Sequence, residues 1–240
     1  MQIGKSMEKE MIRLENVSYA YPDGTKVLVD ISFAIKKGEK VGLIGANGAG
    51  KSTLFKSLLG LVNASGTILI DGLQMNKVNL SQIRKKVGYV IQDSDNQMFM
   101  PTVMEDLIFG PMNYGMSRGE AQEKAEQIMV QLNILHLKEK YNHKISAGEK
   151  KMAAIAAILM MEPEVMLMDE PTSSLDPKNK RNLVGILNKL DVGMVIASHD
   201  MDLIRETTNR VLLLDEGRII ADGTPDEILG NMEMLIEHNL

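Results

Sequence analysis

The sequence predicts an α/β fold with a mainly parallel sheet, an antiparallel β subdomain and an inserted helical subdomain. Two observations support the parallel sheet. The apolar run 41–44 is followed by a glycine-rich loop and a helical pattern. Two further apolar runs, 165–168 and 194–197, are separated by a helical pattern over 183–190. Strands that alternate with helices in this way form parallel sheets through right-handed crossovers.

The loop after the first apolar run, Gly45-Ala46-Asn47-Gly48-Ala49-Gly50-Lys51-Ser52, matches the P-loop pattern G-x-x-x-x-G-K-[ST]. Its glycines let backbone N–H groups point inward at a phosphate chain, and the helix expected over 52–59 directs its N-terminus at the phosphates. Lys51 supplies a positive charge for the β- and γ-phosphates, and Ser52 supplies a hydroxyl for Mg²⁺. The loop therefore predicts a nucleotide-binding site of the P-loop type. Its predicted ATP-binding residues are Gly45, Asn47, Gly48, Ala49, Gly50, Lys51, Ser52 and Thr53.

Composition excludes several other classes of protein. The 240 residues carry a net charge of −5, so no nucleic-acid partner is expected. There are no cysteines, which excludes disulfides and thiolate metal sites. No apolar run approaches the length of a membrane span and no signal peptide is visible, so any membrane role is expected to come through a partner.

The remaining patterns complete the domain plan. Strands are predicted at 12–17, 31–35, 67–70, 87–91 and 210–214, with a turn at 21–24. Residues 93–151 have mostly helical patterns, clearest at 118–132, and 153–161 is a small-residue apolar helix. One domain is expected over 11–240, with 1–10 as an extension. Within it, 11–92 and 162–240 form a RecA-like lobe with the β subdomain, and 93–161 forms a helical lobe.

Asp169-Glu170 follows four apolar residues, as in a Walker B motif. Because the strand ends there, Asp169 can reach Mg²⁺ beside the P-loop, and Glu170 can polarise a water molecule. Taken alone, the pair is also compatible with two helix-capping acids before Pro171.

Ser146-Ala147-Gly148-Glu149 opens the predicted apolar helix, where a helix N-terminus makes an anion site. With Ile145 it resembles the L-S-G-G-Q signature of ATP-binding cassette (ABC) ATPases; an ordinary N-cap serine is the alternative. The resemblance implies that Ser146 and Gly148 bind the γ-phosphate held by an opposite subunit. It therefore implies a head-to-tail dimer with a second copy or a close relative, and two ATP molecules between them.

Other family motifs occur in family order, and the resemblance covers residues 12–223. It implies that Gln92 contacts Mg²⁺ and the attacking water, and that His199 contacts the γ-phosphate. Ser174-Leu175-Asp176 resembles the D-loop at the dimer interface, so Asp176 is counted with the ATP site. Tyr21 resembles the ring that stacks on adenine, and Tyr19 is an alternative. The implied catalytic residues are Glu170, His199, Gln92 and Lys51, and the implied metal ligands are Ser52, Gln92 and Asp169.

Segments 19–25, 92–99 and 102–111 are similar to the ATPases of cobalt/nickel and energy-coupling-factor (ECF) importers. This resemblance implies that region 93–111 meets an integral membrane subunit at the cytoplasmic face of the cell membrane. Its apolar residues would hold a coupling helix and its acids would pair with basic residues at the rim; alternatively, Phe109 and Pro111 only pack the helical lobe. The apolar residues are Met98, Phe99, Met100, Leu107 and Phe109, and the acids are Asp93, Asp95, Glu105 and Asp106.

The chain departs from the family pattern at three positions: Ala147 replaces glycine, Glu149 replaces glutamine and Met152 stands where many members carry arginine. These changes bear on turnover more than on fold. Two other classes of ABC ATPase are alternatives. One is a cytosolic ATPase that serves a soluble assembly such as an iron–sulfur cluster scaffold. The other is a DNA-repair ATPase, which needs a long coiled coil between Lys51 and Ile145, where this chain has no sustained heptads.

Overall fold

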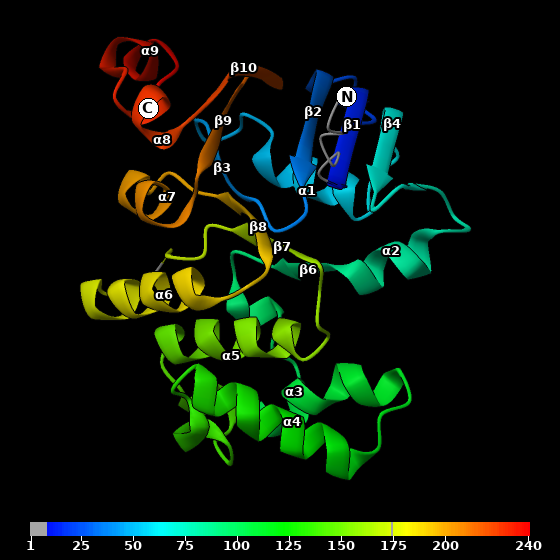
Figure 1. Cartoon of the computed structure of the whole chain (residues 1–240), viewed down its shortest axis with the longest axis vertical. Coiled ribbons are helices and arrows are strands. Elements are labelled where there is room, and N and C mark those ends of the chain that lie inside the picture. The colour runs from blue at the N-terminus through cyan, green and yellow to red at the C-terminus, as the bar shows by residue number, and fades with distance from the viewer. Residues whose placement is uncertain (1–8, 174) are drawn as a thin grey trace, which may run out of the picture.

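A six-stranded, mainly parallel sheet forms the centre of the protein. The computed structural model describes residues 9–173 and 175–240 (Figure 1). The strand order is β10-β9-β3-β8-β7-β6, and only the β10–β9 pair is antiparallel. The predicted α/β class is therefore confirmed. The strand bounds are β3 Lys40–Ile44, β6 Val87–Val90, β7 Val165–Asp169, β8 Gly193–Ala197, β9 Arg210–Asp215 and β10 Arg218–Gly223.

A second, antiparallel sheet has the order β2-β1-β4-β5 and lies at the upper right of Figure 1. It contains β1 Glu10–Ala20, β2 Lys26–Lys36, β4 Ser65–Ile70 and β5 Leu73–Gln74. Glu10, expected in an N-terminal extension, is the first residue of β1. Residues 1–8 of the expected extension lie outside the described residues. Ser174 of the predicted D-loop also lies outside them.

The helices surround the central sheet, and α3, α4 and α5 lie together in the lower part of Figure 1. Each of these three begins with a capping box, at Thr102, Ser117 and Ser146 respectively. The helix bounds are α1 Lys51–Leu58, α2 Leu80–Lys86, α3 Val103–Asn113, α4 Arg118–Gln131, α5 Ala147–Leu159, α6 Pro177–Lys189, α7 Met201–Thr207, α8 Pro225–Leu229 and α9 Met232–Glu237, with 3₁₀ turns η1 Ser94–Asn96, η2 Leu135–Leu137 and η3 Asn142–Lys144.

Several elements differ from the sequence-based prediction. Strand β10 was not predicted because its side chains alternate between exposed and half-buried, which leaves no apolar run. Helix α6 begins six positions before the predicted 183, because Asp176 caps it and Pro177 occupies its first turn. The short helices α2, α7, α8 and α9 were also not predicted, since each has too few turns for a clear period.

Two hydrophobic clusters pack on opposite faces of the central sheet. Alternate residues of β7 divide between them: Val165 and Leu167 join the cluster beneath the antiparallel sheet, and Met166 and Met168 join the cluster beneath the helices. A parallel sheet buried on both faces is expected to consist of continuous apolar strands, as this one does.

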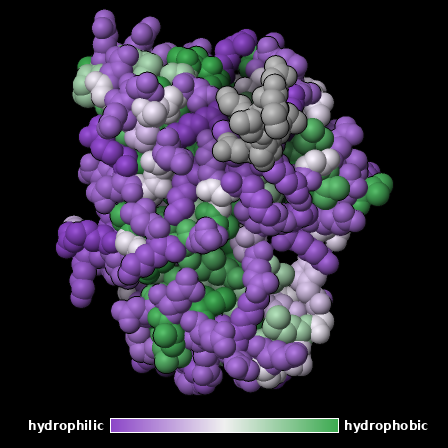
Figure 2. Space-filling model, viewed as in Figure 1, coloured by the Kyte–Doolittle hydropathy of each residue, from purple (hydrophilic) through white to green (hydrophobic). Residues whose placement is uncertain are grey.

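The face shown in Figure 2 is mostly hydrophilic, with hydrophobic residues gathered in its middle over α5. Among the residues described, no helix combines the length and the apolar character that crossing a bilayer requires.

An ion-pair network joins the two sheets. Lys86, the last residue of α2, contacts Asp71 at 2.7 Å and Glu164 at 2.5 Å. Lys9 also contacts Asp71, and Lys37 also contacts Glu164. Hydrogen bonds from Lys86 and Lys9 lower the pKa of Asp71, and those from Lys37 and Lys86 lower the pKa of Glu164. The Asp71 and Glu164 hydrogen bonds raise the pKa of Lys86.

We predict that Lys86→Met lowers the free energy of unfolding by about 1–2 kcal/mol at pH 7, since Lys86 joins two partly buried carboxylates. The acids have lowered pKa values, so their contribution is present above about pH 5 and is lost as the pH falls through the folded-state values. The raised pKa of Lys86 keeps its contribution in place below its ordinary value of 10.5. Urea unfolding at pH 7 and pH 3 measures the difference, with exposed Lys77→Met as the control. A difference from wild type that is no smaller at pH 3 than at pH 7 contradicts the assignment.

Candidate nucleotide site

A cavity of about 380 Å³ opens where the P-loop meets the ends of β6, β7 and β8. It brings together predicted residues from five separate parts of the chain. Val27, which was not predicted, also contributes to the wall. The residues that line it are Tyr21, Val27, Asn47, Gly48, Gly50, Lys51, Ser52, Thr53, Gln92, Asp169, Glu170 and His199.

The P-loop joins β3 to α1, and its conformation requires glycine. Gly50 has φ +112°, and a Cβ atom there would lie 2.7 Å from the carbonyl oxygen of Val27. Only glycine combines this dihedral angle with so close an approach to another backbone segment. Helix α1 starts at Lys51, so the N–H groups of its first turn, at Ser52 and Thr53, face the cavity end of the helix. Gly45 and Ala49 belong to the same loop, although their side of it does not line the cavity.

Lys51 folds over its own loop. Its Nζ donates to the carbonyl oxygen of Gly45 at 2.5 Å and to that of Ala46 at 3.2 Å. Burial lowers the pKa of Lys51, and the charges of Glu170 and Asp169 oppose this effect. The ammonium group therefore sits in the cavity wall with weak acceptors that a more negative group can replace.

Asp169 ends β7 and is 4% exposed. The hydroxyl of Tyr89, on the neighbouring strand β6, donates to its Oδ2 atom at 3.3 Å. Burial and the charge of Asp169 raise the pKa of Tyr89, so this phenol stays protonated and remains a donor. Tyr89 was not among the predicted site residues, because its place beside Asp169 follows from the pairing of β6 with β7.

The oxygen donors in the cavity fit Mg²⁺. Asp169 offers a carboxylate, Ser52 a hydroxyl and Gln92 an amide oxygen, and all three residues line the same cavity. Oxygen ligands of this kind, few in number and supplemented by water and phosphate, are those that Mg²⁺ prefers.

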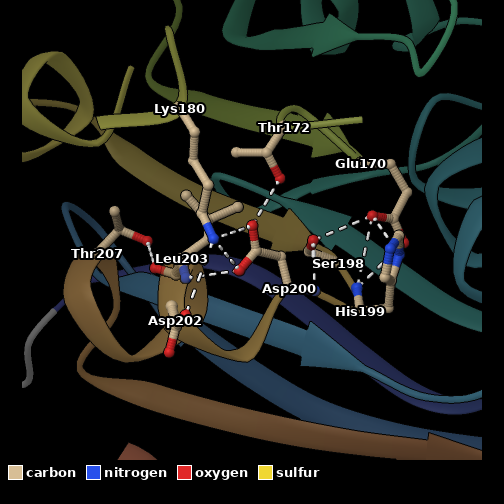
Figure 3. A network of polar contacts seen from close by, with 9 residues as sticks. All are labelled: Glu170, Thr172, Lys180, Ser198, His199, Asp200, Asp202, Leu203 and Thr207. Atoms are coloured by element: carbon tan, nitrogen blue, oxygen red, sulfur yellow. Dashed lines mark hydrogen bonds and ion pairs between the residues drawn. The ribbon is translucent and has the colours of Figure 1, made fainter. Parts of the chain in front are cut away.

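Glu170 is held from three directions (Figure 3). Ser198 donates its hydroxyl to Oε2 at 3.0 Å, and the backbone N–H of His199 donates to Oε1 at 3.2 Å. The Nδ1 atom of the His199 ring lies 2.9 Å from Oε2. Glu170 has φ +45°, a strained value for a residue with a side chain, and its N–H donates to Ala197. The residue Glu170 is 6% exposed, whereas the side chain of His199 is 69% exposed. Ser198 was missed, although its place between an apolar strand and His199 is a signal.

Next to this group, Asp200 joins three segments (Figure 3). It caps α7 through the N–H of Leu203, and it accepts hydrogen bonds from Lys180 at 2.8 Å and Thr172 at 3.1 Å. Burial would raise the pKa of Asp200, but the hydrogen bonds from Lys180 and Leu203 lower it. The ionised carboxylate thus fixes the segment after Glu170 against α6 and α7.

Ser146, Gly148 and Asp176 do not line this cavity. Ser146 caps α5, and its hydroxyl donates to Oε2 of Glu149 at 2.8 Å. Oε1 of Glu149 lies 3.3 Å from Nε2 of His136, so the acid that replaces glutamine has local partners. Gly148 and Asp176 meet through Asn179: a Cβ at Gly148 would lie 2.7 Å from Nδ2 of Asn179, and that atom donates to Asp176. These residues form a second surface, apart from the P-loop of the same chain.

Tyr21 lies at the mouth of the cavity and Tyr19 lies behind it. The Tyr21 hydroxyl is 3.3 Å from Oγ1 of Thr53, and the ring is 38% exposed. The Tyr19 ring packs edge-to-face on that of Tyr21, with centroids 5.3 Å apart, and also packs against the core. Of these two tyrosines, only Tyr21 lines the cavity.

In region 93–111, the expectation that Asp106 pairs with a partner at an exposed rim is wrong. Asp106 is 7% exposed and accepts the N–H groups of Phe99 and Met100, each at 3.1 Å. Burial raises the pKa of Asp106, and these bonds oppose the rise. Glu105 closes the capping box of α3 with Thr102. Met98 and Leu107 are core residues and so are not available for docking.

Phe99 and Phe109 do reach the surface of the same region. They are 65% and 41% exposed, and their rings pack edge-to-face with centroids 5.0 Å apart. The contacts of Asp106 hold the Phe99 backbone against α3, which keeps this aromatic pair together.

A missed residue lies behind the cavity. Lys151, on α5, is 2% exposed, and burial lowers its pKa to about 8. The charges of Asp93 and Asp169 partly oppose this effect. In the sequence, its position beside the apolar residues of a predicted helix was the signal that this lysine could be buried.

Comparisons with known proteins agree with this geometry. Residues 28–173 match the family model described as ABC transporter. The chain is 43% identical to the energy-coupling factor transporter ATP-binding protein EcfA of Methanothermobacter thermautotrophicus, over 94% of this chain and 74% of the relative. It is 39% identical to EcfA of Methanocaldococcus jannaschii, over 96% of this chain and 85% of the relative.

Solved structures give the same result. CbiO1 from Clostridium perfringens, part of the ABC transporter complex CbiONQ, superposes with a TM-score of 0.86 at 36% identity and covers 97% of this chain and 95% of its own. The dimeric ATP-binding cassette MJ0796, bound to ADP and Pi, superposes with a TM-score of 0.81 at 26% identity, over 90% and 99% of the two chains. The chain therefore belongs to the ABC transporter family, as one of its ATP-binding cassette ATPases.

Proposed function

We propose that this chain is the ATP-binding and ATP-hydrolysing subunit of a membrane importer of the cobalt/nickel or ECF type. The observation that carries the proposal is the single cavity in which the P-loop, Asp169, Glu170, Gln92 and His199 meet. Similarity to EcfA and CbiO1 proteins over nearly the whole chain supports the importer class.

The proposed reaction is in-line attack of water on the γ-phosphate of ATP. Phosphate oxygens replace the backbone carbonyls that Lys51 now contacts, and the N–H groups of the P-loop surround the phosphate chain. Ser52, Asp169 and Gln92 are proposed to hold Mg²⁺, which when bound neutralises developing charge on the phosphates. Tyr89 keeps Asp169 oriented toward the cavity through its hydroxyl hydrogen bond.

Glu170 is the proposed general base. Ser198 and the backbone N–H of His199 hold its carboxylate in place, so that a carboxylate oxygen can accept a proton from water. The exposed ring of His199 is free to exchange its contact with Glu170 for the γ-phosphate. Positioned groups, rather than new covalent bonds to the protein, supply the rate enhancement in this class of reaction.

A dimer is part of the proposal. Ser146, Gly148 and Asp176 lie away from the cavity of their own chain, so they are proposed to complete the ATP site of a second chain, identical or closely related. Two ATP molecules would then lie between the two subunits.

The membrane partner is proposed to dock on region 93–111, at the cytoplasmic face of the cell membrane. The aromatic pair Phe99 and Phe109 is the exposed apolar feature of this region, and Asp93 and Asp95 are its exposed acids. Aromatic anchors beside charged residues suit an amphipathic helix with basic residues at its edge. Selection of the transported substrate is proposed to belong to the membrane partner.

Glu170→Gln is expected to bind ATP with unchanged affinity and to lower turnover by about 10²- to 10⁴-fold, the usual contribution of a general base. Phosphate release measures turnover, and nucleotide titration measures binding. Glu206→Gln, an exposed acid on α7, is the matched control and keeps the native rate. Native turnover in the Glu170 variant contradicts the role.

Tyr21→Ala is expected to weaken ATP binding by about 1–3 kcal/mol, by analogy with bases that stack on aromatic rings. Tyr21→Phe keeps the ring and loses only the contact with Thr53, so it separates stacking from hydrogen bonding. Binding is measured by titration with a fluorescent ATP analogue. A loss in Tyr19→Ala together with native affinity in Tyr21→Ala moves the stacking role to Tyr19.

Phe99→Ser combined with Phe109→Ser is expected to abolish co-purification with an integral membrane subunit from detergent-solubilised membranes. ATP binding should not change, because neither residue lines the cavity. Val130→Ser, which alters a side chain of similar exposure on α4, is the control. Native co-purification of the double variant places the docking surface elsewhere, whereas a wild-type chain that co-purifies with no membrane protein favours an ATPase that serves a soluble assembly.

A further inference from the structure

The ammonium group of Lys151 is buried in the junction between α5 and the segment that follows β6. Its Nζ donates to the carbonyl oxygen of Ile91 at 3.1 Å and to that of Gln92 at 2.7 Å. Among the described residues, both acceptors of this ammonium group are backbone carbonyl oxygens and neither is a carboxylate. A buried cation costs free energy unless its donors are satisfied, so these two contacts are what retain Lys151 in the interior.

A second side chain ties the same segment to the same helix. Oε1 of Gln97 accepts the N–H of Ile91 at 3.1 Å, and Nε2 of Gln97 approaches the carbonyl oxygen of Ala154 on α5 at 3.4 Å. Ile91 is therefore held through both its N–H and its carbonyl group. The next residue, Gln92, has its carbonyl held by Lys151 while it lines the nucleotide cavity.

Lys151 also lies close to the start of α5. Ser146 caps this helix, and Lys151 follows five positions later. Lys151 and Gln92 both line a second cavity of about 460 Å³, together with Ile145 and Ala147 at the helix start. One buried side chain thus connects the capped end of α5 to the backbone of Gln92.

We propose that Lys151 is a positioning residue for Gln92: it holds the Gln92 backbone on α5, so that Gln92 and the capped end of α5 move as one body. The inference rests on the proposed function, in which Gln92 serves the ATP of its own chain and Ser146 serves the ATP of the second chain. Lys151 then links the two ATP sites of the dimer through a hydrogen-bonded path between rigid elements.

The test compares steady-state ATP hydrolysis and ATP binding in the purified full chain and its variants. Lys151→Met removes both hydrogen bonds and is expected to lower kcat by about 10- to 100-fold, as loss of a group that orients a ligand does. KM and ATP affinity stay within about twofold of wild type, because Lys151 does not line the nucleotide cavity. Lys151→Arg keeps a cation with several donors and restores most of the turnover.

Lys150→Met is the matched control. Lys150 is the neighbouring lysine on the same helix, but it pairs with the exposed carboxylate of Asp95 instead of the Gln92 backbone. Its variant is expected to keep the wild-type kcat. Equal losses in the Lys150 and Lys151 variants would mean that charge near α5, and not the hydrogen bonds to residues 91 and 92, sets the rate.

A double-variant cycle with Gln92→Ala separates positioning from a general structural role. If Lys151 acts through Gln92, the double variant Lys151→Met with Gln92→Ala is no slower than Gln92→Ala alone. Independent, multiplying losses overturn the proposal, as does native kcat in Lys151→Met. If Lys151→Met loses ATP binding, the cycle is repeated with Lys151→Gln, because glutamine keeps an amide donor at this position. An inactive wild-type chain instead contradicts the proposed function itself.

Discussion

The parallel register of β3, β8 and β7 is the constraint on which the nucleotide site depends. Leu43 of β3 lies opposite Ala197 of β8, and Ala197 lies opposite Asp169 of β7, so these strands end at one level. The loops that leave them carry the P-loop, Glu170 and His199 to the same edge of the sheet. A slip of one residue would move Val165 and Leu167 to the cluster beneath the helices and bring Met166 and Met168 to the other, so the two hydrophobic clusters keep the register.

Four charged residues of the site and its surroundings are buried. Lys51, Lys151, Asp169 and Glu170 are each less than a tenth exposed, and each has at least one hydrogen-bond partner. Such groups are costly to bury, but donors and acceptors that are already oriented need little reorganisation when charge develops on a phosphate. The strained backbone of Glu170 belongs to the same arrangement, because its N–H is bound to β8 while its side chain is held by the loop after β8.

Local motifs made much of the site predictable. The P-loop is contiguous, and Asp169-Glu170 directly follows a buried strand, so short-range pattern was sufficient to group these residues. The surface of region 93–111 was less predictable. Asp106 looked like a surface acid, yet it is buried by backbone N–H groups of Phe99 and Met100, and Met98 and Leu107 became core. Whether an acid or an apolar residue in a helical segment is exposed depends on which neighbours fold over it, and for Asp106 these include Asn142, 36 positions away.

The sequence by itself determined the α/β class, the family and most of the residues that line the nucleotide cavity, because phosphate binding needs particular residues at short, fixed spacing. Only the tertiary structure decided which side chains support them. Tyr89 reaches Asp169 across 80 positions, and Lys151 reaches Gln92 across 59. Tertiary structure also separated Tyr21 at the cavity from Tyr19 behind it, two rings only two positions apart. Contacts of this kind follow from strand order and helix packing, which bring distant residues within hydrogen-bond distance and leave no periodic trace along the chain.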